Sequence, residues 1–272
     1  MLSEILKKNK ISSHLIDSEI ILSRILKISR ERLLTIQSTI STKNIIKFKS
    51  KIERRSKNEP IAYIFRTKEF MGSNFFVDQK SLIPRPETEL LIEPIMKIFK
   101  NKKLFFLEIG IGSGCITLSL LNNLKYSRGV GIDICKKTLK NCKMNLKRLK
   151  LENNCKILHK TVDKLNNIKF DLVVSNPPYI VKRDIKRLSN DIKRFEPIIA
   201  LDGGNDGLDV IKKVIYKSTK VLKLNGILAL EIGYGQFRAV KNLLFTNNFK
   251  IKFVIKDYEN NIRCIFSTLI KK

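Results

Sequence analysis

The stretch that decides the fold of this chain reads LFFLEIGIGSG and spans residues 104–114. Its apolar first half predicts a buried strand over 104–109, and the glycines that follow predict a turn into a helix that begins at Ser113. Because glycine has no Cβ, the backbone of such a turn can come close to a ligand at the carboxyl end of a strand. The stretch therefore predicts one strand and the ligand-holding turn of an α/β sheet.

Strands and helices alternate after this stretch, which is typical of parallel strands joined by crossover helices. Only residues 256–261 separate the last two expected strands, too few for a crossover helix, so these two strands should pair antiparallel. The expected fold is a doubly wound, mostly parallel, seven-stranded sheet. After the first strand, the others are expected at 129–133, 156–159, 170–174, 226–232, 249–255 and 262–269.

The chain before this sheet has a different pattern. Residues 1–58 contain neither glycine nor proline, and their apolar positions recur at helical spacing. They predict a small helical domain over residues 1–59. Residues 60–90 are expected to be a β-hairpin linker, and residues 91–272 the α/β domain. The short strands of the linker are expected at 61–65, 75–77 and 82–83, around a turn at 71–74.

The composition restricts the kinds of site that the chain can hold. It has 54 basic and 25 acidic residues, and the net charge of +29 suits an anionic partner such as nucleic acid. Lys, Ile and Asn are abundant together, however, and an A/T-rich coding sequence produces the same composition without any such partner. The five cysteines show no C-x-x-C spacing and there are only two histidines, so neither a disulfide framework nor metal ligands are expected.

No apolar segment reaches the roughly 18 residues of a membrane span, and the first residues lack the apolar core of a signal peptide. A cytoplasmic protein is expected.

Asp133 lies 19 residues after Gly114, at the end of the next expected strand. A carboxylate there can accept hydrogen bonds from both hydroxyls of a ribose, so the pattern predicts a site for an adenosine-containing cofactor. A NAD fingerprint places its third glycine one residue later, where a pyrophosphate meets the helix. S-adenosylmethionine fits better, because it has no phosphate and its cationic groups suit Glu108 and Asp133. The expected cofactor-binding residues are Glu108, Gly110, Ile111, Gly112, Ser113, Gly114, Asp133 and Asn176.

A second polar segment, Asn176-Pro177-Pro178-Tyr179, follows the apolar run at 170–174. Two prolines fix φ and remove two backbone donors, so the Asn176 side-chain oxygen and the Pro177 carbonyl can present two acceptors to a planar NH2 group. Tyr179 adds an aromatic face on which a flat amide or base can stack. A proline-rich turn is the alternative for Asn-Pro alone, but the full segment after a buried strand favours a catalytic site.

These features resemble the class I S-adenosylmethionine-dependent methyltransferases. Nearly the whole chain is similar to the bacterial release factor glutamine N5-methyltransferases, the PrmC/HemK family. NPPY alone also occurs in DNA adenine-N6 and some rRNA methyltransferases, whereas the RPETE segment and the helical N-terminus are similar to the protein-glutamine branch. The resemblance is carried by PIAYI at 60–64, LIPRPETE at 82–89, the glycine turn at 110–114, Asp133, NPPY at 176–179 and RFEP at 194–197.

The resemblance implies an enzyme of translation termination. It would transfer the methyl group of S-adenosylmethionine to the side-chain amide N5 of the glutamine in the Gly-Gly-Gln motif of peptide chain release factors. A monomer is expected, with release factors as protein partners and the N-terminal helices as their recognition domain. The implied catalytic residues are Asn176, Pro177, Pro178 and Tyr179, which also bind substrate together with Arg85 and Glu87.

One stretch departs from the family, and one rival function stays open. The family usually has an acidic-aromatic pair near the adenine, where this chain reads HKTVD at 159–163, so either Asp163 takes that role or apolar walls hold the adenine. The rival is transfer to an exocyclic amine of a nucleic-acid base, such as N6 of adenine. Residues 136–160 carry nine Lys or Arg and one acid, which favours the rival, although such a run on a helix is more often a solvated face.

Overall fold

The computed structural model describes residues 2–35, 39–161, 164 and 168–271, and the chain forms two compact units. One unit comprises Met1–Arg66 with Ser189–Phe195, and the other comprises Thr67–Leu188 with Glu196–Lys272. None of the described helices is long and apolar enough to cross a lipid bilayer.

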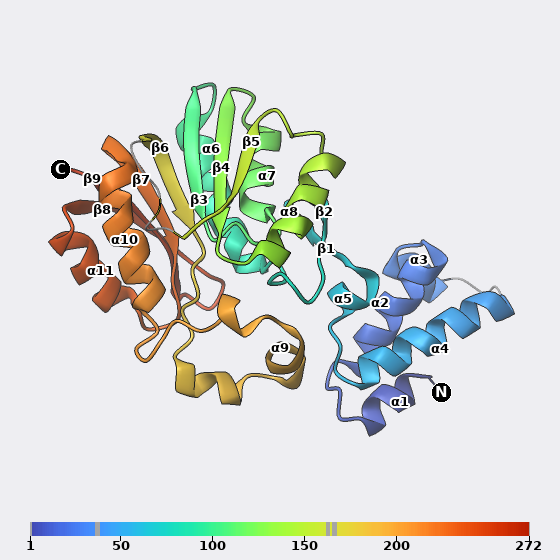
Figure 1. Cartoon of the computed structure of the whole chain (residues 1–272). Coiled ribbons are helices and arrows are strands. Elements are labelled where there is room, and N and C mark those ends of the chain that lie inside the picture. The colour runs from blue at the N-terminus through green and yellow to red at the C-terminus, as the bar shows by residue number, and fades with distance from the viewer. Residues whose placement is uncertain (1, 36–38, 162–163, 165–167, 272) are drawn as a thin grey trace. The chain divides into compact units, whose positions relative to one another are not determined.

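The larger unit contains the seven-stranded sheet that the alternation of strands and helices predicted (Figure 1). The five strands from β5 to β7 run parallel, while β9 pairs antiparallel with both β7 and β8. The antiparallel pairing expected for the last two strands is confirmed. The direction of winding reverses between β3 and β6, which is where α/β sheets hold ligands. In spatial order the strands are β5 (Cys155–His159), β4 (Ser127–Asp133), β3 (Leu104–Ile109), β6 (Phe170–Ser175), β7 (Leu222–Glu231), β9 (Ile262–Leu269) and β8 (Phe249–Lys256).

Helices cover both faces of this sheet (Figure 1), because successive side chains of its buried strands point to opposite faces and both faces are apolar. In β3, for example, Leu107 belongs to one apolar cluster and Phe106 to the other. The doubly wound arrangement is therefore confirmed. One face is covered by α10 (Asp209–Val221) and α11 (Phe237–Thr246), and the other by α6 (Ile92–Phe99), α7 (Cys115–Asn123) and α8 (Lys136–Arg148).

A small antiparallel hairpin, β1 (Thr67–Phe70) and β2 (Ser73–Phe76), precedes the sheet in the chain. Its tight turn is at Met71 and Gly72, which have φ of 47° and 69°. Asn145 of α8 binds the hairpin: its Oδ1 accepts from the Phe76 N–H at 2.6 Å, and its Nδ2 donates to the Phe76 carbonyl at 3.0 Å. This side chain fixes the hairpin against the helix that borders the site described below.

Two of the short strands expected near this hairpin are wrong. Residues 61–65 form helix α5 (Ile61–Phe65), in which the N–H groups of Tyr63 and Ile64 donate to the Pro60 carbonyl at 2.9 and 3.0 Å. So short an apolar run has no periodicity that distinguishes a buried helix from a strand. The tertiary packing that buries Tyr63 and Ile64 determines that the segment is helical. Residues 82–83 form no strand, because the Ile83 N–H donates to the Glu196 carboxylate at 3.1 Å rather than to a neighbouring strand.

The smaller unit is helical, as residues 1–58 predicted. Leu6, Ile21 and Ile52 are fully buried at its centre. Asp17 and Arg55 form a buried ion pair of 2.7 Å, so neither charge is left uncompensated in the core. The helices of this unit are α1 (Leu2–Lys8), α2 (His14–Leu26), α3 (Arg30–Thr35), α4 (Thr42–Ser56), α5 and α9 (Asn190–Phe195).

Candidate active site

The carboxyl ends of β3, β4 and β6 border a cavity of about 620 Å³, at the point where the winding of the sheet reverses. This volume is in the range of small-molecule sites. The wall combines the glycine turn after β3, the segment after β4, the elbow after β6, and parts of residues 80–88 and 197–202. Segments far apart in the sequence therefore meet around one cavity.

Most of the predicted site residues lie on this wall. Gly114, Pro177, Tyr179 and Glu87 do not line the cavity. The residues that do line it are Arg85, Glu108, Gly110, Ile111, Gly112, Ser113, Asp133, Asn176 and Pro178.

The glycine turn is held mainly by backbone hydrogen bonds. The N–H groups of Gly110 and Ile111 both donate to the Ile132 carbonyl at 2.9 Å, and the Gly114 N–H donates to the Ile111 carbonyl at 2.8 Å. At Gly114, φ is +86° and a Cβ would lie 2.8 Å from the Cys142 sulfur of α8. Only glycine allows α7 to start this close to α8.

Two carboxylates lie beside the turn. Glu108 is buried, and its Oε2 accepts from the Thr117 N–H at 2.9 Å and from the Thr117 hydroxyl, which fixes the first turn of α7. Burial raises the pKa of Glu108 to about 8, and the nearby Asp133 charge acts in the same direction. Burial also raises the pKa of Asp133, whose Oδ2 accepts from the Gly112 N–H at 3.1 Å and whose Oδ1 accepts from the Cys135 N–H at 2.8 Å. Each Asp133 oxygen keeps a lone pair for a further donor.

The stretch that departs from the family pattern is only partly described. Asp163 lies outside the described residues, so the prediction about it has no structural counterpart. Lys160, Thr161 and Ile134 line the cavity next to Asp133. The His159 ring contacts the Ile134 carbonyl at 3.0 Å. An apolar side chain, Ile134, is therefore present on this part of the wall.

The elbow after β6 is placed beside the glycine turn by Ser175, whose hydroxyl donates to the Ile109 carbonyl at 2.7 Å. Asn176 then donates through Nδ2 to the Thr88 hydroxyl oxygen at 3.0 Å. Within the part of the chain that the structure describes, neither Asn176 Oδ1 nor the Pro177 carbonyl accepts a hydrogen bond. The elbow therefore keeps two acceptors without a protein donor.

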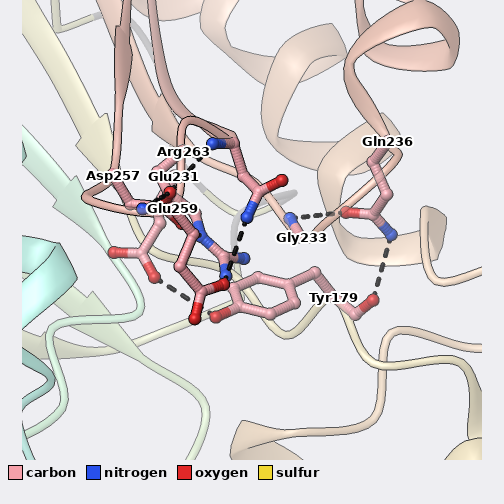
Figure 2. Close-up of polar contacts among 8 residues, drawn as sticks. Tyr179, Glu231, Gly233, Gln236, Asp257, Glu259 and Arg263 are labelled. Atoms are coloured by element: carbon pink, nitrogen blue, oxygen red, sulfur yellow. Dashed lines mark hydrogen bonds and ion pairs between the residues drawn. The ribbon is translucent and has the colours of Figure 1, made fainter.

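Tyr179 is held at both its hydroxyl and its backbone (Figure 2). Its hydroxyl donates to Glu231 Oε1 at 3.3 Å, and burial, together with the Glu231 charge, raises the pKa of the phenol well above its usual value. Its carbonyl accepts from Gln236 Nε2 at 3.0 Å, while Gln236 Oε1 accepts from the Gly233 N–H at 2.8 Å. The phenol ring packs against the apolar cluster under α10 and α11, which explains why it does not line the cavity.

The chain after the elbow is tied to the segment before α10. The Ile180 N–H donates to the Leu201 carbonyl at 3.0 Å, and the Gly203 N–H donates to the Ile180 carbonyl at 2.8 Å. A Cβ on Gly203 would lie 2.8 Å from the Cα of Tyr179, so a side chain at this position would displace the elbow. Gly203 is therefore part of what positions Tyr179.

Arg85 and Glu87 have different surroundings. The Arg85 guanidinium pairs with Glu196 Oε1 at 2.5 Å, and the other oxygen of this buried carboxylate accepts from Ile83. Arg85 therefore joins the 80–88 and 197–202 walls of the cavity. Glu87 is exposed. Their roles in substrate binding stay predictions.

Besides Ser175 and Gly203, sequence reasoning missed three side chains from other segments that hold the elbow, namely those of Thr88, Glu231 and Gln236. Thr88 belonged to a recognised segment but was given no role in the site, and its hydroxyl donates to Glu231 Oε2 at 2.7 Å. Glu231 is the last residue of β7, the strand next to β6. A polar residue at the carboxyl end of a strand adjacent to the elbow was the signal that could have found it.

Among the residues that the structure describes, no group of three or more His, Cys, Asp or Glu side chains could hold a metal ion. All five cysteines are free thiols. Besides its carboxyl, amide and hydroxyl groups, the cavity wall carries the thiols of Cys115 and Cys135 and the cationic side chains of Lys80, Arg85, Lys160 and Lys213.

Comparison with known proteins identifies the class and then the family. The fold is that of class I methyltransferases: a methyltransferase from Pyrococcus furiosus superposes with a TM-score of 0.57 at 15% identity, over 75% of this chain and 92% of that one. Residues 1–65 match the PrmC N-terminal domain, and residues 86–193 match the methyltransferase small domain. The release factor glutamine methyltransferase of Clostridium acetobutylicum is 37% identical, over 97% of this chain and 94% of that protein. That of Fusobacterium nucleatum is also 37% identical, over 97% of this chain and 76% of that protein. The chain belongs to the PrmC family of release factor glutamine methyltransferases.

Proposed function

We propose that this enzyme transfers a methyl group from S-adenosylmethionine to the side-chain amide nitrogen of the glutamine in the Gly-Gly-Gln motif of peptide chain release factors. The observation that carries the proposal is the orientation of the Asn176 amide. Its NH2 group is bound to Thr88, so its oxygen remains as an acceptor on a cavity wall that also contains the glycine turn. The names of the relatives support release factors as substrates.

The cavity has the chemistry that this cofactor requires. Asp133 has lone pairs for two ribose hydroxyls, and the side-chain oxygens of Asp133 and Glu108 can accept hydrogen bonds from the donor groups of the ligand. The backbone of Gly110 and Gly112 leaves room beside them, and Ile134 offers an apolar wall for the adenine. S-adenosylmethionine supplies an electrophilic methyl group on a positively charged sulfur.

The elbow would act on the glutamine amide by holding its plane. An amide nitrogen is a poor nucleophile, because its lone pair is delocalised into the carbonyl. Asn176 Oδ1 and the Pro177 carbonyl would each accept one of the two N–H groups of the substrate and keep the nitrogen directed at the methyl carbon. Such orientation can contribute several kcal/mol to catalysis. The new C–N bond forms as the S–C bond breaks, and the acidified nitrogen then loses a proton to water, so no protein base is assigned.

Tyr179 is proposed to stack on the substrate amide at the edge of the cavity, where it follows Pro178 of the cavity wall. Its hydroxyl is already bound to Glu231 and its ring rests on the sheet. If stacking is its main role, Tyr179→Ala should lower kcat far more than Tyr179→Phe, which keeps the ring. Equal losses in the two variants would assign the effect to the hydroxyl instead.

The roles proposed for the other segments rest on the resemblance to the family. We infer that residues 1–59 recognise the release factor, that residues 60–90 link them to the catalytic residues 91–272, and that Arg85 and Glu87 contribute to substrate binding. The enzyme would act as a monomer. Residues 1–65 match the PrmC N-terminal domain, which supports a recognition domain specific to this family.

The test of the function offers the purified protein three substrates with labelled S-adenosylmethionine: a release factor, the same factor with Gln→Ala in its Gly-Gly-Gln motif, and RNA. Label on the unaltered factor alone is the expected result. Equal label on both factors would refute the glutamine assignment. Label on RNA in place of protein would favour the rival that the basic residues of α8 suggest.

A further inference from the structure

We propose that Glu231 is a positioning residue of the methyl transfer, which acts through Thr88 to keep the Asn176 side-chain oxygen available to the substrate amide. The inference rests on the function proposed above and deepens it. It adds to the elbow two residues that come from other segments, Thr88 from η1 (Pro86–Leu91) and Glu231 from the end of β7.

The direction of two hydrogen bonds fixes the Asn176 amide. A carboxylate has no proton to donate, so the Thr88 hydroxyl donates to Glu231 Oε2, at 2.7 Å. With its single proton used in this way, the Thr88 oxygen can only accept, and Asn176 Nδ2 donates to it at 3.0 Å. An Asn176 amide rotated by half a turn would place its NH2 group against the NH2 group of the substrate. The Asn176–Thr88–Glu231 chain prevents this rotation.

Glu231 acts from behind the cavity wall. Thr88 and Asn176 line the cavity, whereas Glu231 does not. Thr88 and Glu231 expose only 2% and 1% of their surface, so water has little access to replace a lost partner. The register of β6 and β7 places Ser175 opposite Leu230, which brings the residues that follow, Asn176 and Glu231, to the same edge of the sheet.

The same carboxylate also holds the second side chain of the elbow. Glu231 Oε1 accepts from the Tyr179 hydroxyl at 3.3 Å (Figure 2). Both oxygens of Glu231 are therefore used on residues of the elbow, one directly and one through Thr88. A single buried acid orients both the amide and the aromatic ring that the proposed reaction uses.

The protonation state of Glu231 gives this role a measurable signature. Burial raises the pKa of Glu231 to about 7, against the hydrogen bonds from Thr88 and Tyr179 that lower it. Protonated Glu231 can donate a hydrogen bond to the Thr88 hydroxyl, which is then free to donate to Asn176 Oδ1. The hydrogen bonds then no longer fix the orientation of the Asn176 amide. The acceptor arrangement is held by the charged form and is lost as the pH falls through about 7. The titratable or charged groups around it are Glu87 of η1, Tyr179 of the elbow, Arg263 and Cys264 of β9, and Cys115 of α7.

The first test compares Thr88→Val with Thr88→Ser in the full-length enzyme, with labelled S-adenosylmethionine and release factor. Valine keeps the shape of threonine without its hydroxyl, and serine keeps the hydroxyl. We expect Thr88→Val to lower kcat at least about tenfold with an unchanged KM for the cofactor, and Thr88→Ser to recover most of that loss. Equal kcat for the two variants, or a loss confined to the KM of the cofactor, would overturn the proposal.

The second test is the pH profile of kcat for the unaltered enzyme and for Glu231→Gln. The Gln oxygen can accept from Thr88 but does not titrate, so the fall of kcat below about pH 7 should be present in the unaltered enzyme and absent in the variant. Identical profiles would assign the titration to another group and refute the role of Glu231. An unaltered enzyme that labels no glutamine would refute the proposed function instead, so the two failures are distinguishable.

Discussion

The glycine turn after β3 and the elbow after β6 border the same cavity but are held in different ways. The turn is fixed by its own backbone and by the next strand, through hydrogen bonds to Ile132 and Asp133. The elbow depends on Thr88, Glu231 and Gln236, which come from three other segments. A binding loop can thus be a local structure, whereas the orientation of a reactive side chain is a property of the assembled sheet.

The largest expected effect separates the two regions by function. Asn176→Ala removes the acceptor of the elbow, and we expect kcat to fall about a thousandfold, with little change in the dissociation constant of S-adenosylmethionine. Asp133→Ala should instead weaken cofactor binding by about tenfold or more, because it removes a charged acceptor. Kinetics and calorimetric titration measure the two quantities. A loss of cofactor binding in Asn176→Ala as large as in Asp133→Ala would contradict this division.

Each region also contains one buried acid, and stability should depend on pH through both. Burial raises the pKa of Glu108 to about 8 and that of Glu231 to about 7, from a usual value of 4.5. The native state then holds protons that the unfolded state releases. The free energy of unfolding should therefore decrease as the pH rises from about 4.5, the usual value, to about 8, the higher of the two folded-state values, by several kcal/mol.

Urea unfolding at several pH values measures this decrease. Glu231→Gln should remove the contribution that ends near pH 7, and Glu108→Gln the contribution that continues to about pH 8, since each variant abolishes one titration. A free energy of unfolding that stays constant over the whole range would show that neither acid is buried in its neutral form.

A smaller effect tests whether the glycine turn is held by close packing. At Gly114, φ is +86° and a Cβ would lie 2.8 Å from Cys142 Sγ, whereas at Gly72 φ is +69° and nothing lies within 4 Å. We expect Gly114→Ala to lower the free energy of unfolding by about 2–3 kcal/mol and Gly72→Ala by about 1 kcal/mol. Equal losses would mean that backbone strain alone, without the packing of α7 on α8, requires glycine at this position.

The smallest expected effect concerns the backbone of the elbow. Gln236→Ala leaves the carbonyls of Tyr179 and Gly207 and the N–H of Gly233 without their partner. We expect kcat to fall about tenfold with cofactor binding intact, because the elbow shifts while the glycine turn does not. Gln236→Glu is the matched variant, since it keeps the acceptor for Gly233 and loses both donors. Unchanged kcat in both variants would show that Gln236 does not position the elbow.

Much of the fold followed from local patterns. The alternation of apolar strands with helical segments gave the seven-stranded sheet, and the short connection at 256–261 gave its antiparallel end. The predictions of strands at 61–65 and 82–83 were wrong, because tertiary contacts determine the conformation of both segments. A run of five apolar residues suits helix α5 as well as a strand, and the Ile83 N–H found a side-chain acceptor 113 residues away.

The sequence by itself determined the chemistry present in this protein: a glycine turn with its acid, and an Asn-Pro-Pro-Tyr segment, each at the end of an apolar strand. Spacing along the chain reports such features, because a strand and its following turn are continuous in sequence. Only the tertiary structure decided that Thr88 and Glu231 meet Asn176 and fix which end of its amide remains free. A hydrogen bond has a direction set by donors and acceptors brought together from distant segments, and no local pattern carries that information.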